Sequence, residues 1–183
     1  VAARTRELEA LNGIAATVSQ SLDLKEVMHR ALEKVCQVTA TEWGSIHLLD
    51  DQTDELVLAA SYGLPAPAVE TLRVARLKRG QSFAGRVVES GEPLVVENPA
   101  TDPRAVARIE ELESLAVVPL RARGKVVGTL GTGSAARRHF TPEDVALLRA
   151  IGHQVGVAIE NARLYAETQR LSLTDPLTGL RNR

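Results

Sequence analysis

The side chains with the greatest chemical reactivity in this sequence of 183 residues are those of four histidines and one cysteine. They are His29, His47, His139, His153 and Cys36. Their spacing does not match a metal-ligand motif. The sequence also has no phosphate-binding P-loop, no G-x-S-x-G nucleophile turn and no H-E-x-x-H zinc helix. We therefore expect a domain that is not an enzyme, with no catalytic residue, no metal site and no resident cofactor.

His47 is the histidine that best suits a binding role. It alternates with Ile46 and Leu48 on a predicted strand, so its side chain faces the opposite side from theirs. A pocket acid, a haem ligand and a half-buried side chain satisfied by a neighbour are all open at this point. Haem is disfavoured because aromatic residues make up only 3% of the chain.

The sequence predicts two helices before the strand that carries His47. Apolar residues at alternating spacings of three and four predict a linker or dimerisation helix over residues 1–21; they are Leu8, Leu11, Ala15, Val18 and Leu22. Asp23 is a good N-cap for a second helix that ends near Thr41.

Short apolar runs separated by turns predict about six strands, at residues 45–50, 55–61, 77–80, 94–97, 114–122 and 125–134. Short helices are expected near 65–72, over 82–90 with Ser82 as the cap and Gly91 as the stop, and over 105–112. Tight hairpins favour an antiparallel sheet, so the fold class is α+β.

A long helix closes the pattern. Thr141 as N-cap and Pro142 at the first position start it, and no helix breaker follows before about Leu173. It carries a second apolar seam: Leu148, Ile151, Val155, Ala158, Ala162 and Tyr165. Gly152 and Gly156 would let another helix approach closely. We expect the terminal helices to form a homodimer interface; the alternative is that both seams pack on the chain's own sheet.

Composition narrows the possible partners. The chain is 44% hydrophobic with a formal net charge of −1, and its few aromatics leave little for stacking bases, so no nucleic-acid partner is expected. No apolar run approaches the roughly 20 residues that span a bilayer. A single cysteine fits a reducing compartment. We expect a cytoplasmic domain.

Three segments, LKRGQSFAGRVVESGEPLVVENPATDPR, SLAVVPLRARGKVVGTLGTGS and FTPEDVALLRAIGHQVGVAIENARLY, resemble the GAF family of small-molecule-binding regulatory domains. With the helix before them, the resemblance covers residues 22–165. It implies a six-stranded antiparallel sheet flanked by helices, with the long terminal helices on one face and a ligand pocket on the other.

The segment TDPLTGLRNR, residues 174–183, resembles the opening of a GGDEF domain, the catalytic unit of diguanylate cyclases. This resemblance implies that residues 166–173 are a signalling linker. It also implies that this chain is the sensor part of a longer enzyme that makes cyclic di-GMP, whose catalytic groups would lie beyond Arg183. Two such active sites must meet, which is a further reason to expect a dimer.

Within the expected pocket we place eight ligand-binding residues: His47, Tyr62, Ser82, Phe83, Val96, Asn98, Asp102 and Thr129. Asp102 and Arg104 belong to a loop that would cover the pocket, and they could pair with each other or with the ligand. The backbone N–H groups after Ser82 would suit a carboxylate or phosphate.

Several alternatives stay open. Asn98, Phe140 and Asp144 match part of the cyclic-nucleotide signature of GAF domains, but Pro99 and Val145 replace its Lys and Glu. Reduction of methionine sulfoxide, known in some GAF proteins, needs more cysteines than this chain has, and a bilin would need one in the pocket loops. A GAF domain with a collapsed pocket, serving only as a dimerisation scaffold, is the main alternative function.

Overall fold

The computed structural model describes residues 23–172. Six antiparallel strands form one sheet in the order β3-β2-β1-β6-β5-β4. The strands are β1 (Trp43–Leu49), β2 (Glu55–Tyr62), β3 (Leu77–Lys78), β4 (Leu94–Glu97), β5 (Ser114–Ala122) and β6 (Lys125–Ser134). The α+β class and the six-stranded antiparallel sheet are therefore confirmed.

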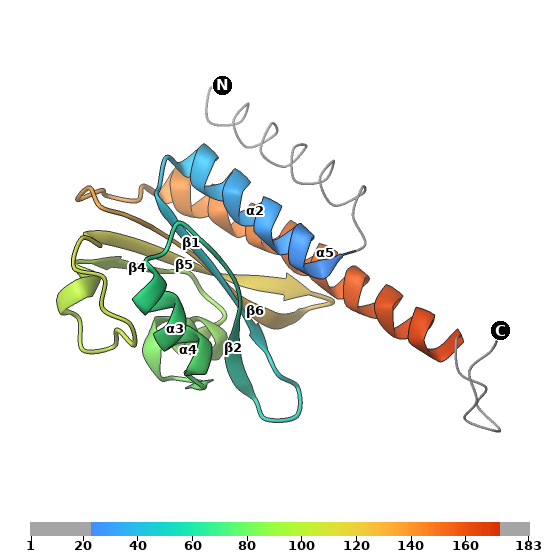
Figure 1. Cartoon of the computed structure of the whole chain (residues 1–183). Helices are drawn as coiled ribbons and strands as arrows, with labels where there is room; N and C mark the ends of the chain where they lie inside the picture. Colours follow the sequence, from blue (N-terminus) through green and yellow to red (C-terminus); the bar gives the residue numbers. More distant parts are fainter. Residues whose placement is uncertain (1–22, 173–183) are drawn as a thin grey trace.

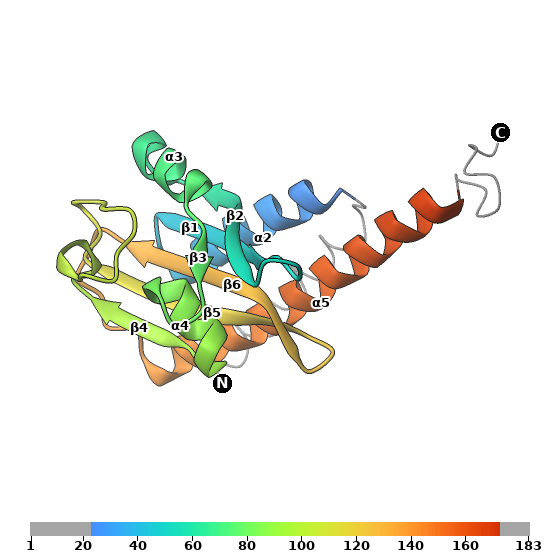
Figure 2. The same cartoon turned by 90° about the horizontal axis from the view of Figure 1, so that it is seen from below.

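Helices cover the sheet on both sides (Figures 1 and 2). Helices α2 (Leu24–Thr39) and α5 (Pro142–Ser172) lie together on one face. Helices α3 (Ala66–Val74) and α4 (Ser82–Ser90), with the 3-10 turn η1 (Pro99–Thr101) and the loop after it, lie on the other. The C-terminal part of α5 extends well beyond the sheet (Figure 1).

Local sequence explains where the long helices begin. The side chain of Asp23 accepts a hydrogen bond from the backbone N–H of Lys25 at the start of α2. At the start of α5, Thr141 and Asp144 cap each other, because the backbone N–H of each donates to the side-chain oxygen of the other, over 3.0 and 3.2 Å. Gly91, with φ +69°, ends α4 as predicted.

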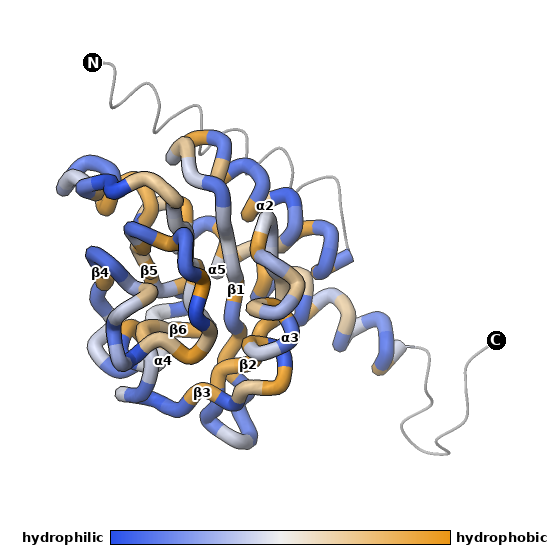
Figure 3. Tube along the Cα trace, turned by 60° about the vertical axis from the view of Figure 1, so that its left-hand side comes forward, coloured by the Kyte–Doolittle hydropathy of each residue, from blue (hydrophilic) through white to orange (hydrophobic). Residues whose placement is uncertain are grey.

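The main core lies between the sheet and the helix pair. Alternate strand residues such as Ile46 and Leu130 point to this side and are fully buried against α2 and α5. The helices contribute their apolar faces, and α2 shows hydrophilic and hydrophobic residues in alternation along its turns (Figure 3). The remaining strand residues, including His47 and Thr129, face the opposite side, where α3 and α4 lie.

The seam on α5 does not have the role that we expected. Leu148, Ile151, Gly152, Val155 and Gly156 are all buried in the chain's own core, so they are not free to contact a second copy. A Cβ atom on either glycine would lie within 3 Å of β5 backbone atoms. The two glycines therefore allow α5 to approach β5 closely, and they do not face another helix. These five residues therefore pack on the chain's own sheet, which is the alternative stated for the seam.

Two further expectations concern other parts of the chain. Residues 105–112 form turns and irregular backbone, so the predicted helix is wrong. The side chain of Asp102 binds the backbone N–H of Arg104, and Ile109 and Leu112 turn inward to pack with Ala68. Leu8 and Leu11 lie outside the described residues. Within residues 23–172, no helix is long and apolar enough to cross a membrane.

Candidate functional site

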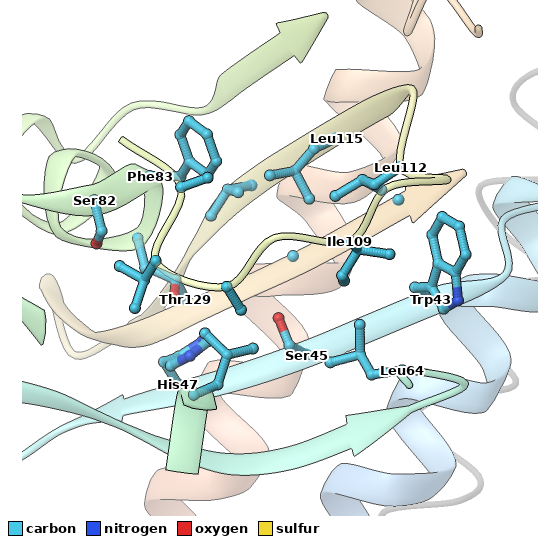
Figure 4. Close-up of a pocket in the computed structure, with 18 of the residues that line it drawn as sticks. Trp43, Ser45, His47, Leu64, Ser82, Phe83, Ile109, Leu112, Leu115 and Thr129 are labelled. Atoms are coloured by element: carbon cyan, nitrogen blue, oxygen red, sulfur yellow. The ribbon is translucent and has the colours of Figure 1, made fainter. Parts of the chain in front are cut away.

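A cavity of about 100 Å³ lies between the sheet and the layer formed by α3, α4 and the loop after η1 (Figure 4). Most of its lining is apolar. The larger lining side chains are Trp43, Leu64, Leu72, Leu77, Phe83, Ile109, Leu112, Leu115 and Val117. Val106 also lines it and is 41% exposed, so the pocket reaches the surface beside this residue.

Glycines on the sheet create the space. Gly131 and Gly133 on β6 have the same alternation as Thr129 and face the cavity. A Cβ atom on Gly131 would point among Ser45, Leu115 and Val117, all of which line the pocket. A side chain at Gly131 would therefore enter the pocket floor, where its Cβ atom would lie 3.2 Å from Oγ of Ser45.

The floor also carries two buried polar atoms without a hydrogen-bond partner among the described residues: Nε2 of His47 and Oγ1 of Thr129. His47 is 6% exposed and Thr129 is fully buried. The two residues are directly paired across β1 and β6. Burial lowers the pKa of His47 to about 4, so the imidazole is neutral at pH 7. Unpaired buried polar groups are uncommon in native structures and call for an explanation.

Arg104 places a charge at the wall, but this charge is already paired. Its Nε and one terminal nitrogen donate to the two carboxylate oxygens of Asp102, over 2.8 and 2.5 Å. These hydrogen bonds lower the pKa of Asp102 to about 2. The guanidinium carbon lies 5.2 Å from the ring centroid of Phe83, which it partly covers. The pairing of Asp102 with Arg104 is as the sequence suggested.

Ser82 stands at the start of α4, although Gln81 is the N-cap residue. Its φ of +60° is uncommon for a residue other than glycine. Its hydroxyl accepts a hydrogen bond of 3.2 Å from the backbone N–H of Gly85. The expected anion site at this helix start is therefore partly occupied by the serine itself.

The structure brings some of the predicted ligand-binding residues together and separates others. His47, Ser82, Phe83 and Thr129 line the pocket, and Asp102 acts on it through Arg104.

The remaining three predicted positions are corrected. Tyr62 lies by α2, with its ring 6.0 Å from that of His29, because β2 is displaced by the register shift in its pairing with β1. Val96 is buried on the edge strand β4 and does not line the cavity. Asn98 accepts a hydrogen bond from Arg137 at its side-chain oxygen, away from the pocket.

Several lining residues were missed from sequence. Trp43 and Ser45 share their face with His47, so strict alternation along β1 would have found them. Gly131 would have followed from Thr129 in the same way. Ile109 and Leu112 had no such signal, because their spacing suggested a helix.

The three residues that match part of the cyclic-nucleotide signature do not line the pocket. Phe140 belongs to the core between the sheet and the helix pair, and Asp144 caps α5 and pairs with Arg138 at 3.2 Å. With Asn98 bound to Arg137, each of these three residues has a structural role. Cys36 lies buried on α2, across the sheet from the cavity, and burial raises the pKa of its thiol.

Comparison with known proteins identifies the class to which this fold belongs. The profile of the GAF domain matches residues 21–160, so the chain belongs to the GAF domain family of sensory and regulatory domains. The chain is similar to the Nif-specific regulatory protein of Azospirillum brasilense, with 26% identity over 92% of this chain and 28% of that protein. It is also 26% identical to the sensor histidine kinase YhcY of Bacillus subtilis, over 93% of this chain and 46% of that protein. The chain thus spans less than half the length of these relatives.

Solved structures agree on the fold. The GAF domain of a phosphoenolpyruvate-protein phosphotransferase from Coxiella burnetii has a TM-score of 0.76 and 23% identity, covering 89% of this chain and 98% of that one. A free methionine-R-sulfoxide reductase from Neisseria meningitidis, solved with its substrate, has a TM-score of 0.73 and 24% identity, over 87% and 91% of the chains. At these identities the likeness concerns the fold alone.

Proposed function

We propose that this chain is a non-catalytic sensor domain that binds a small molecule in the pocket on the α3–α4 face and controls a diguanylate cyclase that follows it. The observation that carries the proposal is the pair of buried, unpartnered atoms on the pocket floor, Nε2 of His47 and Oγ1 of Thr129. A collapsed scaffold pocket has no reason to keep two such groups, because each is costly to leave without a hydrogen bond.

Helix α5 is the proposed output element. It packs on β5 over Gly152 and Gly156 and continues to Ser172, two residues before the segment that resembles a GGDEF opening. A shift of β5 caused by ligand would therefore act directly on the helix that enters the output domain. The names of the relatives, which are regulatory proteins and a sensor kinase, support a regulatory role.

We further propose that the chain acts as a homodimer, through the exposed part of α5. Val157 and Leu171 are 37% and 61% exposed, and Leu164 lies midway between them. The seven-residue spacing puts the three on one stripe of the helix, as in a two-helix coiled coil. Tyr165, 45% exposed, lies beside this stripe and is the one residue of the predicted seam on α5 that is both described and exposed.

Native mass spectrometry of the chain tests ligand binding. We expect a reproducible extra mass in the wild-type protein, and its loss in Gly131→Val, whose side chain would fill the pocket floor. Val95→Ala, at an exposed position on the edge strand, is the control and should keep the extra mass.

A wild-type chain that carries no extra mass, and that a broad metabolite library fails to stabilise, would favour the scaffold function. In the longer protein, cyclase output that responds equally to the ligand in wild type and Gly131→Val would contradict the proposed role of the pocket.

A further inference from the structure

The two unpartnered atoms on the pocket floor define what a ligand must offer. His47 and Thr129 are direct neighbours across β1 and β6 and face the same cavity (Figure 4). Residues paired in this way have Cβ atoms about 4.5–5.5 Å apart. One polar group of a ligand can therefore lie within reach of both side chains.

The polar group of the ligand has to form hydrogen bonds with two side chains that can each be a donor or an acceptor. A neutral imidazole nitrogen either donates or accepts, according to its tautomer, and a threonine hydroxyl can do both. A ligand hydroxyl, which also donates and accepts, matches every combination, and a primary amide offers a donor and an acceptor side by side. Ser45, on the same face of β1, adds a further hydroxyl at the cavity (Figure 4).

The walls argue against a charged ligand. Among the described residues that line the cavity, Arg104 is the one with a permanent charge, and both oxygens of Asp102 already neutralise it. His47 is uncharged at neutral pH because of its burial. A carboxylate or ammonium group on the floor would therefore lose its hydration without gaining a counter-ion, which is strongly unfavourable.

The volume sets the size. An apolar cavity of about 150 Å³ accepts benzene. The cavity here, of about 100 Å³, is smaller, so it takes on the order of four to six non-hydrogen atoms. A longer ligand would have to extend past Val106 toward the surface.

We propose that the pocket selects a small uncharged molecule with an apolar, branched or cyclic body and one hydroxyl or amide group, which hydrogen-bonds both Nε2 of His47 and Oγ1 of Thr129. This proposal rests on the sensor function proposed above and adds the chemical class of its ligand. The apolar body lies against Leu115 and Val117, which line the cavity.

A matched set of four-carbon probes tests the class. The neutral members are 2-methylpropan-1-ol and 2-methylpropanamide, and the charged members are 2-methylpropanoate and 2-methylpropylammonium. Each is titrated into the chain at pH 7.5 while NMR follows two reporters. One is the Nε2 resonance of His47, identified by its absence in His47→Gln. The other is the indole N–H of Trp43, the single tryptophan, which lines the same cavity.

We expect the alcohol and the amide to shift both reporters and to bind at least about tenfold more tightly than either ion, a difference of about 1.4 kcal/mol. Thr129→Val keeps the shape of the side chain and removes one hydrogen bond, so it should weaken both neutral probes by about three- to tenfold. Thr132→Val, one residue away from Gly131 on the other face of β6, should leave their affinity unchanged.

Three results would overturn the proposal in different ways. If an ion shifts the Trp43 indole and the neutral probes do not, the ligand class is wrong and the sensor function stands. If no probe moves either reporter, the class is wrong as well, and the co-purified mass described above then decides whether the sensor function fails with it. Equal binding of the neutral probes to wild type and Thr129→Val would show that the floor atoms do not select the ligand.

Discussion

At the scale of single residues, the side chains on the pocket floor lower the free energy of unfolding of the ligand-free chain. His47 and Thr129 each bury a polar atom that has no hydrogen-bond partner among the described residues. Thr132, on the same strand as Thr129, has a hydroxyl with hydrogen-bond partners. Its Oγ1 lies 2.5 Å from Oγ1 of Thr41 and 3.2 Å from the carbonyl oxygen of Trp43. On β6, the hydroxyl without a partner therefore lies on the pocket face, and the satisfied hydroxyl lies on the opposite face.

Replacing Thr129 or Thr132 by valine distinguishes a hydroxyl without a hydrogen-bond partner from one that has partners. Thr129→Val removes an unsatisfied hydroxyl, so the free energy of unfolding of the ligand-free chain should rise by about 1 kcal/mol. Thr132→Val breaks a satisfied network and should lower it by about 1 kcal/mol. Urea unfolding followed by circular dichroism measures both. A loss of stability in Thr129→Val as large as that in Thr132→Val would mean that the Thr129 hydroxyl has a partner.

The buried imidazole predicts a dependence of stability on pH. The pKa of His47 is lowered from 6.5 to about 4, so between these values the unfolded chain binds a proton that the folded chain does not. Stability is therefore complete above pH 6.5 and falls as the pH drops toward 4. On going from pH 7.5 to 5, the free energy of unfolding should lose about 2 kcal/mol from this group.

Two variants isolate this contribution. His47→Gln should show a pH dependence that is smaller by the same amount, whereas His153→Gln, at an exposed position on α5, should behave as wild type. Urea titrations at the two pH values give the comparison. A slope that persists in His47→Gln would assign the effect to other groups.

At the scale of elements, the sequence predicted what local chemistry controls. The N-cap Thr141 and the stop at Gly91 were recognisable, and so were the hairpins. Residues 105–112 were misjudged because the spacing of Ile109 and Leu112 is explained by contacts with α3 and β6, which no local pattern contains.

The candidate site was predictable to the extent that it follows strand alternation. His47 and Thr129 lie at the pocket because they face away from the main core. Tyr62 did not follow, since a register shift between Ile46 and His47 changes which β2 residues share that face. A bulge of this kind is set by packing and leaves no clear mark in the sequence.

The contact between α5 and β5 yields a prediction about the seam glycines. A Cβ atom on Gly156 would lie 2.5 Å from the carbonyl oxygen and 2.6 Å from the nitrogen of Arg121. Gly→Ala in a helix is ordinarily stabilising, but here it forces the helix off the strand. We expect Gly156→Ala to lower the free energy of unfolding by about 1–3 kcal/mol.

Asn161→Ala supplies the control, because Asn161 lies at an exposed position of the same helix, and the variant should gain a few tenths of a kcal/mol from the higher helix propensity of alanine. Thermal and urea unfolding measure both variants. If Gly156→Ala were as stable as Asn161→Ala, α5 would not be held against β5 as closely as the structure has it, and the coupling proposed for this contact would lose its basis.

At the scale of the whole molecule, the sheet lies between the pocket and the long helix α5. The α3–α4 face holds the pocket, and the α2–α5 face holds the long helix that leaves the domain. Because β5 lines the pocket with Leu115 and Val117 and supports α5 with its backbone, it is the shortest physical connection between the two faces. A ligand can bias this connection only by binding two arrangements of β5 and α5 with different affinity.

The proposed dimer can be tested on the part of α5 that extends beyond the sheet. Val157, Leu164 and Leu171 form the apolar stripe of the proposed interface, in which Leu164 is half-buried and Leu171 is the residue nearest the end of α5. Leu171→Glu would put a charge without a counter-ion into a helix pair, which should raise the dimer dissociation constant by about tenfold or more. Ala166→Glu adds the same charge to the opposite side of the helix and should leave the constant unchanged.

Sedimentation equilibrium over a range of concentrations gives the dissociation constant of both variants, and circular dichroism confirms that each is folded. Leu171 is too exposed to support the chain's own core, so a change confined to Leu171→Glu must come from association. Equal dissociation constants for wild type and both variants would exclude the stripe as the interface. The dimer would then depend on other surfaces, and α5 would carry its signal to the output domain within a single chain.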